Sequence, residues 1–495
     1  MGKPTQLSLT ARAITFFLFL IAAFSWLTSC EKKNYPPHQS PNQLEKIKHS
    51  GILNVTTRID PTTFYYGPKG LTGLEFDLVN LFAKQLGVKV KFHTPRAFAD
   101  ILKRVEEGKT DIAAAGLTIT QARLETMRFA PPYQEITEKV IYRSGTKRPR
   151  KITHLSEGIF EVVRSSSHVG SLNKLQQTEP ALNWLVNKKL DSFGLIYLVN
   201  KGLIDYTVAD SNQIALVGRF YPKLHTGINI SKPRKLAWAL PRSNDISLFN
   251  EVNSFFKKIK KDKTLAQLIE RYYGHTSSLN YVDGCKFREH TKSRLPALQD
   301  FFFKASKTHE LDWKLLAAIG YQESHWLINA VSPTGVEGLM MLTRNTAKQM
   351  GIKDRTDPAA SILGGTKYFQ RIIKKIPERI PEPDRTWMAL ASYNIGFGHL
   401  EDARILTQKR GGNPDRWAEV KKSLPLLKKK KWYKKTKFGY ARGDEPVTYV
   451  ENIRSYYDLL VWLTEENQIE KTVMFVDKQN KVSVNKAISI KALAL

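Results

Sequence analysis

Short apolar runs alternate with amphipathic stretches over the first half of the chain. In order, they predict a strand at 52–56, a helix at 76–86, a strand at 88–92, a helix at 100–107 and a buried strand at 112–115. Gly87 and Gly108 follow the two helices, as is typical of helix ends. Because strands that alternate with helices usually form a parallel sheet, the pattern predicts an α/β domain at 45–275, with its last helix at 264–273.

Helical patterns largely replace strand patterns beyond residue 290. Apolar residues recur three and four positions apart in 295–307 and in 312–323. This spacing predicts a mainly helical domain at 291–465, after a linker at 276–290. The residues that remain, 466–495, are expected to form a C-terminal tail.

The first thirty residues have the pattern of an export signal. Lys3 and Arg12 precede an apolar run at 13–26, and Leu-Thr-Ser-Cys follows at 27–30. The run is too short to span a bilayer comfortably. Its ending resembles the bacterial lipobox, in which the signal is cut before a cysteine that then receives lipid. This predicts a signal peptide at 1–29 and a lipid-anchored Cys30; an ordinary cleaved signal or an uncleaved anchor is the alternative.

The residues around Cys30 indicate how the folded body is tethered and which membrane holds the anchor. Residues 30–44 are polar and rich in proline, as a tether between an anchor and a folded body would be. By resemblance to lipoprotein-sorting patterns, Glu31 after the cysteine favours the periplasmic face of the outer membrane over the inner membrane. Lipidation would leave Cys285 as the one remaining cysteine, which excludes an internal disulfide. The histidines show no metal-ligand spacing, so neither a metal nor another cofactor is predicted.

The formal net charge of +31 calls for an acidic partner. Nucleic acid, anionic lipid and the carboxylate-bearing peptides of peptidoglycan would all fit, but an exported protein does not meet nucleic acid. Seven of the lysines lie at 427–438, around Trp432 and Tyr433. Aromatic rings and lysines together would suit a glycan groove, whereas a solvated basic loop is the alternative. The sequence assigns no site there.

The α/β region carries motifs of a known family. Gly-Lys-Thr-Asp at 108–111, Gly-Leu-Thr-Ile-Thr at 116–120 and Phe-Ala-Pro-Pro-Tyr at 129–133 resemble the periplasmic solute-binding proteins of the amino-acid-binding family. The resemblance implies a two-lobed α/β domain whose lobes close on a small ligand, an amino acid or a peptide.

The same resemblance implies three ligand-binding residues. Arg123 would hold a ligand carboxylate and Thr118 would add a hydrogen bond. Asp210, the last residue of a segment at 202–210 that matches the family, would receive an ammonium group. Capping of its own helix, or a salt bridge within it, is the alternative for Arg123. Arg164 stands where the family often has glycine, so the ligand itself is left open.

One carboxylate stands out in the helical region. Leu315, Ile319 and Glu323 are four residues apart, so Glu323 lies on the apolar face of its predicted helix, at the C-terminal end. Burial there would raise the pKa of the carboxyl group, as a general acid that works near neutral pH requires. An exposed glutamate at a helix end is the alternative.

Four ordered motifs surround that glutamate. They are Tyr-Gln-Glu-Ser-His-Trp at 321–326, Ser-Pro-Thr-Gly-Val-Glu-Gly-Leu-Met-Met-Leu at 332–342, Ala-Ser-Tyr-Asn-Ile-Gly-Phe-Gly at 391–398 and Glu-Pro-Val-Thr-Tyr-Val at 445–450. In this order they resemble the soluble-lytic-transglycosylase family, which has a goose-lysozyme-like fold. The resemblance implies peptidoglycan glycan strands as substrate.

Residue roles follow from the same resemblance. Glu323 would be the acid and base, Ser332 and Tyr393 would border the site, and Asn394, Glu445 and Tyr449 would support the groove. Two positions depart from the family. Met341 replaces a common glutamine, and Glu445 precedes Pro446 where threonine is usual.

The number of catalytic carboxylates separates the possible reactions. A glycosidase that uses water normally needs two of them, and Glu323 has no evident partner because Glu337, in a turn-like stretch, is expected to face solvent. One acid suffices if the 6-hydroxyl of N-acetylmuramic acid attacks and closes an anhydro ring. A hydrolysing muramidase, or a lipoprotein receptor for amino acids or peptides with a silent helical domain, is the alternative. A ligand of the front domain is also expected to modulate the activity of the helical domain.

Overall fold

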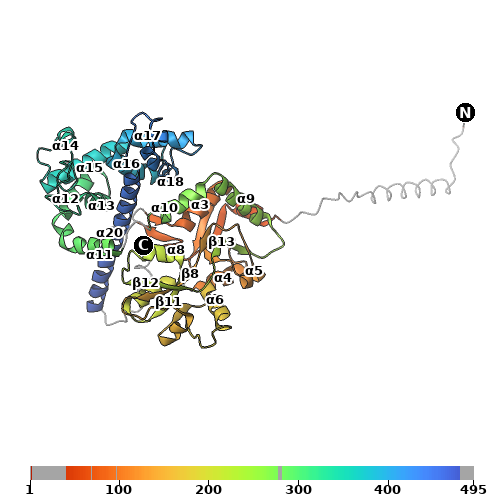
Figure 1. The fold of residues 1–495 in the computed structure, drawn as a ribbon. Coiled ribbons are helices and arrows are strands. Elements are labelled where there is room, and N and C mark those ends of the chain that lie inside the picture. Colours follow the sequence, from red (N-terminus) through yellow and green to blue (C-terminus); the bar gives the residue numbers. More distant parts are fainter. Residues whose placement is uncertain (1, 3–40, 68–69, 96, 277–280, 480–495) are drawn as a thin grey trace.

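The computed structural model describes residues 2, 41–67, 70–95, 97–276 and 281–479. The signal peptide, Cys30, most of the tether and the end of the tail lie outside the described residues. Figure 1 shows a two-lobed α/β body, in red to yellow, beside a helical body in green to blue. The predicted fold class, a two-lobed α/β domain followed by a mainly helical one, is confirmed.

The first lobe is built on a six-stranded sheet in the order β4-β1-β5-β13-β6, with β7 paired to β13. Its strands are β4 (Lys89–His93), β1 (Ile52–Thr56), β5 (Ile112–Thr118), β13 (Arg234–Pro241), β6 (Met127–Phe129) and β7 (Gln134–Ile136). β4, β1 and β5 are parallel, as expected, but β13 runs antiparallel to β5, β6 and β7. The expected parallel pairing thus holds for the strands at 52–56, 88–92 and 112–115, and β13, β6 and β7 add an antiparallel part to the sheet. β13 is the segment by which the chain returns from the second lobe, so it enters the sheet in the opposite direction.

Helices cover both faces of this sheet. α3 (Leu74–Leu86), α9 (Ser247–Lys261) and α10 (Thr264–Tyr273) share one core with Ile112 and Ala114, whereas α4 (Phe98–Glu106) packs with Ala113 and Ala115 on the other face. Successive residues of a strand point to opposite faces, so β5 is buried on both. Burial on both faces explains why the apolar run of β5 is uninterrupted, whereas a strand buried on one face would alternate apolar and polar residues.

The second lobe is smaller. β8 (Glu138–Arg143) pairs antiparallel with β11 (Tyr206–Asp210) and β12 (Leu224–Asn229), and β9 (Glu161–Val163) pairs parallel with β10 (Leu185–Asn187). The remaining elements of the α/β body are α2 (Gln43–Ser50), β2 (Tyr65–Gly67), β3 (Gly70–Thr72), α5 (Gln121–Thr126), η1 (Ile152–Glu157), α6 (Ser167–Gln176), α7 (Ser192–Lys201) and α8 (Ser211–Val217). β8 begins and β11 ends next to the cleft between the lobes, at Glu138 and Asp210.

Helices make up the rear body in the described residues. They are α11 (Tyr281–Ser293), η2 (Leu295–Ala297), α12 (Gln299–His309), α13 (Trp313–Ser324), α14 (Arg344–Met350), α15 (Pro358–Lys375), α16 (Asp384–Ile395), α17 (Phe397–Lys409), α18 (Trp417–Val420), η3 (Leu424–Lys428), α19 (Lys430–Tyr433) and α20 (Asp444–Gln479). α13 lies at the centre, with nearly every residue from Leu316 to Tyr321 buried against neighbouring helices.

Two boundaries differ from those predicted. Residues 281–290, expected in a linker, form part of α11, and the fully buried ring of Phe287 stacks on Tyr456 with 4.9 Å between centroids. α11 therefore belongs structurally to the helical body. At the other end α20 continues to Gln479, through the first part of the expected tail. None of the helices in the described ranges is long and apolar enough to cross a membrane.

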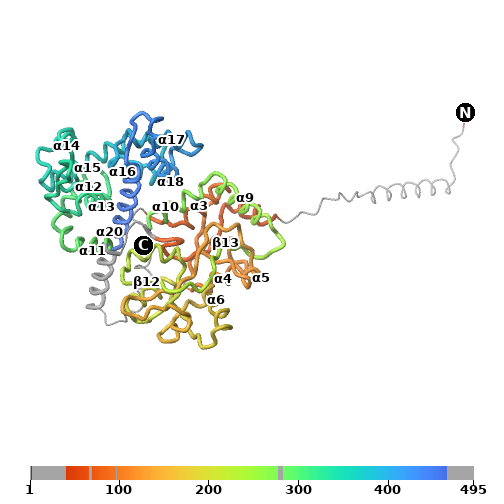
Figure 2. The backbone as a smooth tube through the Cα atoms, in the orientation of Figure 1, coloured from red at the N-terminus to blue at the C-terminus, as the bar shows by residue number. Residues whose placement is uncertain are grey.

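α20 lies where the two bodies meet, as Figure 2 also shows. Its Asp458 accepts from His275, 2.7 Å from Nε2, and lies 2.9 Å from Arg219 Nη1 of the second lobe. Its Arg454 lies 3.3 Å from Glu270 of α10, and its Trp462 stacks on Phe220 with 5.5 Å between centroids. α20 thus contacts both lobes of the α/β body.

Candidate functional site

α13 presents Glu323 at a sharply defined helix end. The helix begins at Asp312, whose side chain accepts from Lys314 N at 2.8 Å, and ends at His325, which has a φ of 51°. Trp326 then folds back, and its indole Nε1 donates to Ala317 O at 2.8 Å. This buried indole fixes the turn that follows Glu323.

A glycine-containing loop packs against the same helix end. Gly338 has a φ of 83°, and a Cβ there would overlap Arg355 O at 1.8 Å. Gly320 of α13 is equally confined, because a Cβ would lie 2.9 Å from the Leu339 side chain. The two glycines let the loop at 338–342 lie close to α13, which brings the second motif beside Glu323.

Glu323 has the environment of a general acid. Its side chain is partly exposed, and burial raises the pKa of its carboxyl group from 4.5 to about 7. Tyr449 Oη donates to Glu323 Oε1 at 2.5 Å, which works in the opposite direction and lowers that pKa. No charged side chain contributes to the shift. At neutral pH the group is therefore close to half protonated, so it can give and then take a proton.

Two tyrosines form the wall next to Glu323. Tyr393 of α16 stacks on Tyr449 of α20, with 6.5 Å between ring centroids and 14° between the planes. Tyr393 Oη donates to Met340 O at 3.1 Å, in the loop described above. Burial, and then the charge of Glu323, raise the pKa of both phenols well above the usual range, so both remain donors. Residues from all four motifs thus meet around one carboxylate.

The other predicted groove residues are more exposed. Ser332 Oγ accepts from Val336 N at 3.0 Å and lies 3.0 Å from Thr334 Oγ1, so this side chain shapes its own turn. Asn394 and Glu445 are exposed, and Glu445 lies 3.3 Å from Arg442 Nη1. In the described part of the chain, no hydrogen bond or ion pair joins these three residues to Glu323. Their role in substrate binding stays a prediction.

Glu337 does not face solvent as expected. It lies 2.8 Å from Arg355 Nη2, and its side chain is mostly covered. Arg355 Nη1 also donates to Leu342 O at 2.8 Å, so this pair braces the loop at 338–342. A carboxylate held in this way is not free to activate water.

The predicted ligand residues of the α/β body lie in the cleft between its lobes. Arg123 Nη1 donates to Thr118 O at 2.9 Å, and Nη2 donates across the cleft to Ser165 O at 3.1 Å. Ser167 Oγ donates to Thr118 Oγ1 at 3.3 Å, also across the cleft. The two lobes are therefore in direct contact at the place where the ligand was expected.

Arg123 is suited to bind an anion. The guanidinium is buried, which lowers its pKa to about 10. Its hydrogen bonds go to carbonyl oxygens, and none of the described carboxylates lies within ion-pair distance of it. The salt bridge considered as an alternative is therefore not formed, and a ligand carboxylate would supply the missing negative charge.

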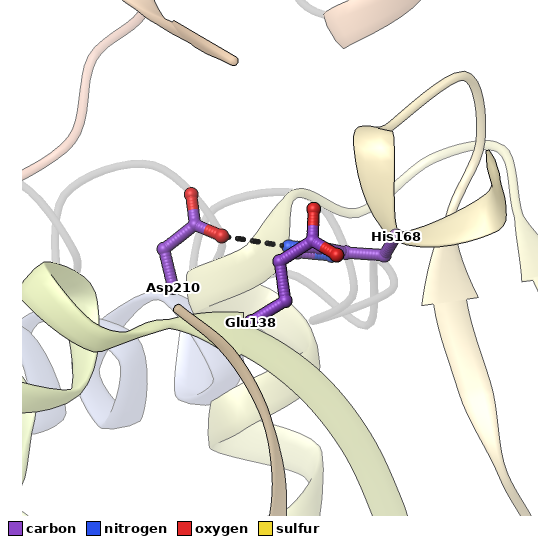
Figure 3. Close-up of side chains that lie close together, drawn as sticks. All are labelled: Glu138, His168 and Asp210. Atoms are coloured by element: carbon purple, nitrogen blue, oxygen red, sulfur yellow. Dashed lines mark hydrogen bonds and ion pairs between the residues drawn. The ribbon is translucent and has the colours of Figure 1, made fainter. Parts of the chain in front are cut away.

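Asp210 has a partner that sequence reasoning missed. His168 Nε2 lies 3.0 Å from Asp210 Oδ1, and Figure 3 shows these two side chains pointing toward each other. A carboxylate oxygen of Glu138 lies within 4.8 Å of both. Burial lowers the pKa of His168, but the hydrogen bond and charge of Asp210 outweigh it, so the pKa is raised. A ligand ammonium group would have to compete with this imidazole. No signal in the sequence linked His168 to Asp210, 42 residues away.

Those three side chains form the one cluster in the described residues that offers three close metal-ligand atoms. Positive charge is already present there, however. Arg234 Nε lies 3.8 Å from Glu138 Oε1, and the Ser171 hydroxyl donates to the same carboxylate. Glu138 is thus better explained as the partner of a guanidinium and a hydroxyl than as a ligand of a cation.

Two family descriptions match the chain. Residues 53–275 match "Bacterial extracellular solute-binding proteins, family 3", and residues 300–415 match "Transglycosylase SLT domain". The fold and the two sites therefore define a class of protein in which a solute-binding domain precedes a transglycosylase domain.

Full-length relatives identify the family within that class. "Membrane-bound lytic murein transglycosylase F" of Saccharophagus degradans is 45% identical over 443 residues, which cover 90% of this chain and 88% of the relative. The protein of the same name from Idiomarina loihiensis is 43% identical over 458 residues, which cover 92% and 99%. The chain belongs to the family of membrane-bound lytic murein transglycosylase F.

Solved structures similar to the chain match its front part. An ancestral arginine-binding protein bound to arginine is 24% identical, with a TM-score of 0.41, and the match covers 45% of this chain and 98% of that one.

Proposed function

We propose that this chain is a lytic transglycosylase of peptidoglycan. It cleaves the β-1,4 bond between N-acetylmuramic acid and N-acetylglucosamine and leaves a 1,6-anhydro ring on the muramic acid. The observation that carries the proposal is the environment of Glu323, whose pKa burial raises to about 7, which accepts a hydrogen bond from Tyr449, and whose pKa no charged side chain of the described residues shifts. Membership of the family supports the same reaction.

Glu323 takes both proton-transfer steps. In its protonated form it gives a proton to the glycosidic oxygen, so the bond to the anomeric carbon breaks and N-acetylglucosamine leaves. The resulting carboxylate accepts the proton of the muramic 6-hydroxyl, whose oxygen bonds to the same anomeric carbon. The glutamate regains its proton and no water is consumed. Tyr449 holds Oε1, which leaves Oε2 to face the substrate.

A hydrolysing muramidase would need another carboxylate to position water. Glu337 is held by Arg355, and the pKa of Glu323 shows no influence of a second acid. These observations favour the sugar's own hydroxyl as the nucleophile. A silent helical domain is disfavoured because a buried carboxyl group with a raised pKa destabilises the fold at neutral pH, and groups of this kind cluster at functional sites.

Product analysis tests the reaction. Purified sacculi are digested with the full-length chain in detergent, with Glu323→Gln in parallel, and the products are identified by mass spectrometry. We expect anhydro-muropeptides from the parent and a rate lower by about 10²–10⁴-fold in the variant, because a general acid is lost. Reducing-end products would identify a muramidase instead. Near-normal turnover by the variant would reject Glu323 as the acid.

We infer that a lipid on Cys30 holds the enzyme at the periplasmic face of the outer membrane. The lipobox-like ending at 27–30 and Glu31 support this anchor, and the relatives are named membrane-bound. The test is fractionation of cells that express the parent or Cys30→Ala. We expect the parent in the outer-membrane fraction and the variant outside it. Equal membrane binding of both would contradict a lipid anchor at Cys30.

We further propose that the cleft of the α/β body binds an amino acid or peptide through a carboxylate. Arg123 and Thr118 would contact the ligand, and Asp210 would take its ammonium group if His168 gave way. Arg123 is the strongest element of this site because it is buried without a carboxylate partner among the described residues.

Binding in the cleft would modulate the transglycosylase through α20. This helix carries Tyr449, the hydrogen-bond donor to Glu323, and two and a half turns later Asp458, which contacts the second lobe. A cavity of about 480 Å³ lies at the joint, lined by residues of both bodies such as Tyr272 and Trp387. Since close packing makes an interface rigid, this space leaves α20 room to shift when the lobes move.

A further inference from the structure

A basic, aromatic surface lies at one edge of the helical body. We call residues 428–440 the basic rim; they contain seven lysines and no acid. All seven lysine side chains are exposed. In the described part of the chain, only Lys428 has a carboxylate within ion-pair distance, Asp444 Oδ2 at 2.5 Å. Six of these charges are therefore left without a neutralising carboxylate, although Lys437 Nζ also lies 5.5 Å from the centre of the Phe438 ring. This excess of positive charge favours an external anion.

Aromatic rings are exposed among these lysines. The side chains of Phe438 and Tyr440 are 52% and 56% exposed. Tyr433 supports Tyr440 edge-on, with 5.7 Å between centroids, while Trp432 is half-buried beneath Arg410. A solvated basic loop would explain the lysines, but it gives no reason to hold two rings on the surface. Flat apolar faces beside cations suit a carbohydrate that carries acidic substituents.

The rim is fastened to α17, whose first two residues end the motif at 391–398. Buried Asp402 accepts from Lys437 N at 3.0 Å and from Phe438 N at 2.9 Å. The Phe438 ring covers Gly398, where a Cβ would lie 2.9 Å from the ring. Gly398 closes the motif that includes Asn394. At its other end the rim leads directly into α20, which carries Tyr449.

We propose that the basic rim is a binding site for the stem peptides of the glycan strand that enters the groove. The lysine ammonium groups bind the carboxylates of those peptides, and Phe438 and Tyr440 stack on the apolar faces of neighbouring sugars. The proposal rests on the transglycosylase function, since it places the rim along the same strand that Glu323 cleaves. Such binding makes the enzyme prefer glycan strands that still carry their stem peptides.

Two substrates separate this role from a general effect. One is intact sacculi, and the other is glycan strands whose peptides an amidase has removed. In the full-length chain we expect Lys434→Gln/Lys435→Gln/Lys437→Gln to raise the KM for intact sacculi about ten-fold at low salt, with little effect at high salt. The KM for peptide-free strands and the kcat for both should stay close to those of the parent. Phe438→Ala/Tyr440→Ala should raise KM on both substrates.

Controls make the result decisive. Lys257→Gln/Lys258→Gln/Lys261→Gln removes three exposed lysines of α9 in the other body and should leave both KM values unchanged. Circular dichroism confirms that each variant is folded. An equal loss on both substrates, or no loss on either, would overturn the peptide-binding role of the lysines. If anhydro products persist in that case, the proposed reaction stands and only the rim is rejected.

Discussion

The hydroxyl group of Tyr449 affects the pH range in which Glu323 can act as an acid. Burial raises the pKa of the carboxyl group to about 7, and the hydrogen bond from Tyr449 lowers it. Only the protonated form can start the reaction, so kcat/KM should fall as pH rises through this pKa. In Tyr449→Phe the lowering contribution is lost and the pKa rises. We expect the alkaline fall in kcat/KM to move to higher pH, measured between pH 5 and 9 on peptidoglycan.

Tyr393→Phe is the matched control for that prediction. It removes a phenol that stacks on Tyr449, but its hydroxyl donates to Met340 O and not to Glu323. It should change the rate without moving the pH profile. Equal shifts in the two variants, or no shift in Tyr449→Phe, would show that the Tyr449 hydrogen bond does not set the acidity of Glu323.

Single residues could be predicted from sequence where a local pattern places them. The apolar face of one helix predicted a desolvated position for Glu323, and burial in the structure raises the pKa of this carboxyl group, while its catalytic role stays a prediction. His168 shows the limit, since it reaches Asp210 only when two distant segments fold together. Glu337 shows the same limit. Its turn-like surroundings suggested exposure, but Arg355, 18 positions away, covers it.

At the scale of elements, α20 joins the catalytic site to the α/β body. Asp458 accepts from His275 and lies 2.9 Å from Arg219. Burial raises the pKa of Asp458, but the charge of Arg219 and the interaction with His275 outweigh it and lower the pKa to about 2. Asp458→Asn would leave Arg219 buried without a neutralising charge. Because Asp458 is itself about one-third exposed, we expect a loss of about 1–3 kcal/mol in the free energy of unfolding. Calorimetry should then resolve two transitions, one for each body.

Glu289→Gln provides the control for that measurement. Glu289 is an exposed acid on α11, so its loss should leave the unfolding profile unchanged. A single transition at the parent temperature in Asp458→Asn would mean that α20 docks through its apolar contacts, such as Trp462 on Phe220, and not through the ion pairs.

Helices and strands could be predicted where apolar residues recur with one clear spacing along the sequence. The strand at 52–56 and the helix at 264–273 agree with β1 and α10, because each has a clear apolar pattern and a turn at its end. The direction of β13 was not predictable, since it depends on where the chain returns from the second lobe. Residues 281–290 of α11 were expected in a linker because their apolar residues do not form a clear helical face. In the structure Phe287 anchors this helix in the core.

On the scale of the whole molecule, α20 joins the catalytic site to both lobes that form the cleft, so the two sites should influence each other. If closing of the cleft shifts α20, the peptide fraction released from sacculi by an amidase should change the rate of anhydro-product formation. Arg123→Ala removes the buried guanidinium, so we expect the ratio of the rates with and without peptides to approach one. Arg148→Ala, which removes an exposed arginine of the second lobe beyond the end of β8, should keep the ratio of the parent.

The sign of the effect is set by which arrangement of the lobes brings Tyr449 and Glu323 together. Linkage makes the coupling reciprocal, so a non-hydrolysed glycan that fills the groove must change the affinity of the cleft for peptides by the same factor. Isothermal titration of Glu323→Gln with the peptide fraction, with and without glycan strands, measures that factor. An unchanged affinity, together with an unchanged ratio in Arg123→Ala, would mean that the two bodies bind independently and that α20 serves only to hold them together.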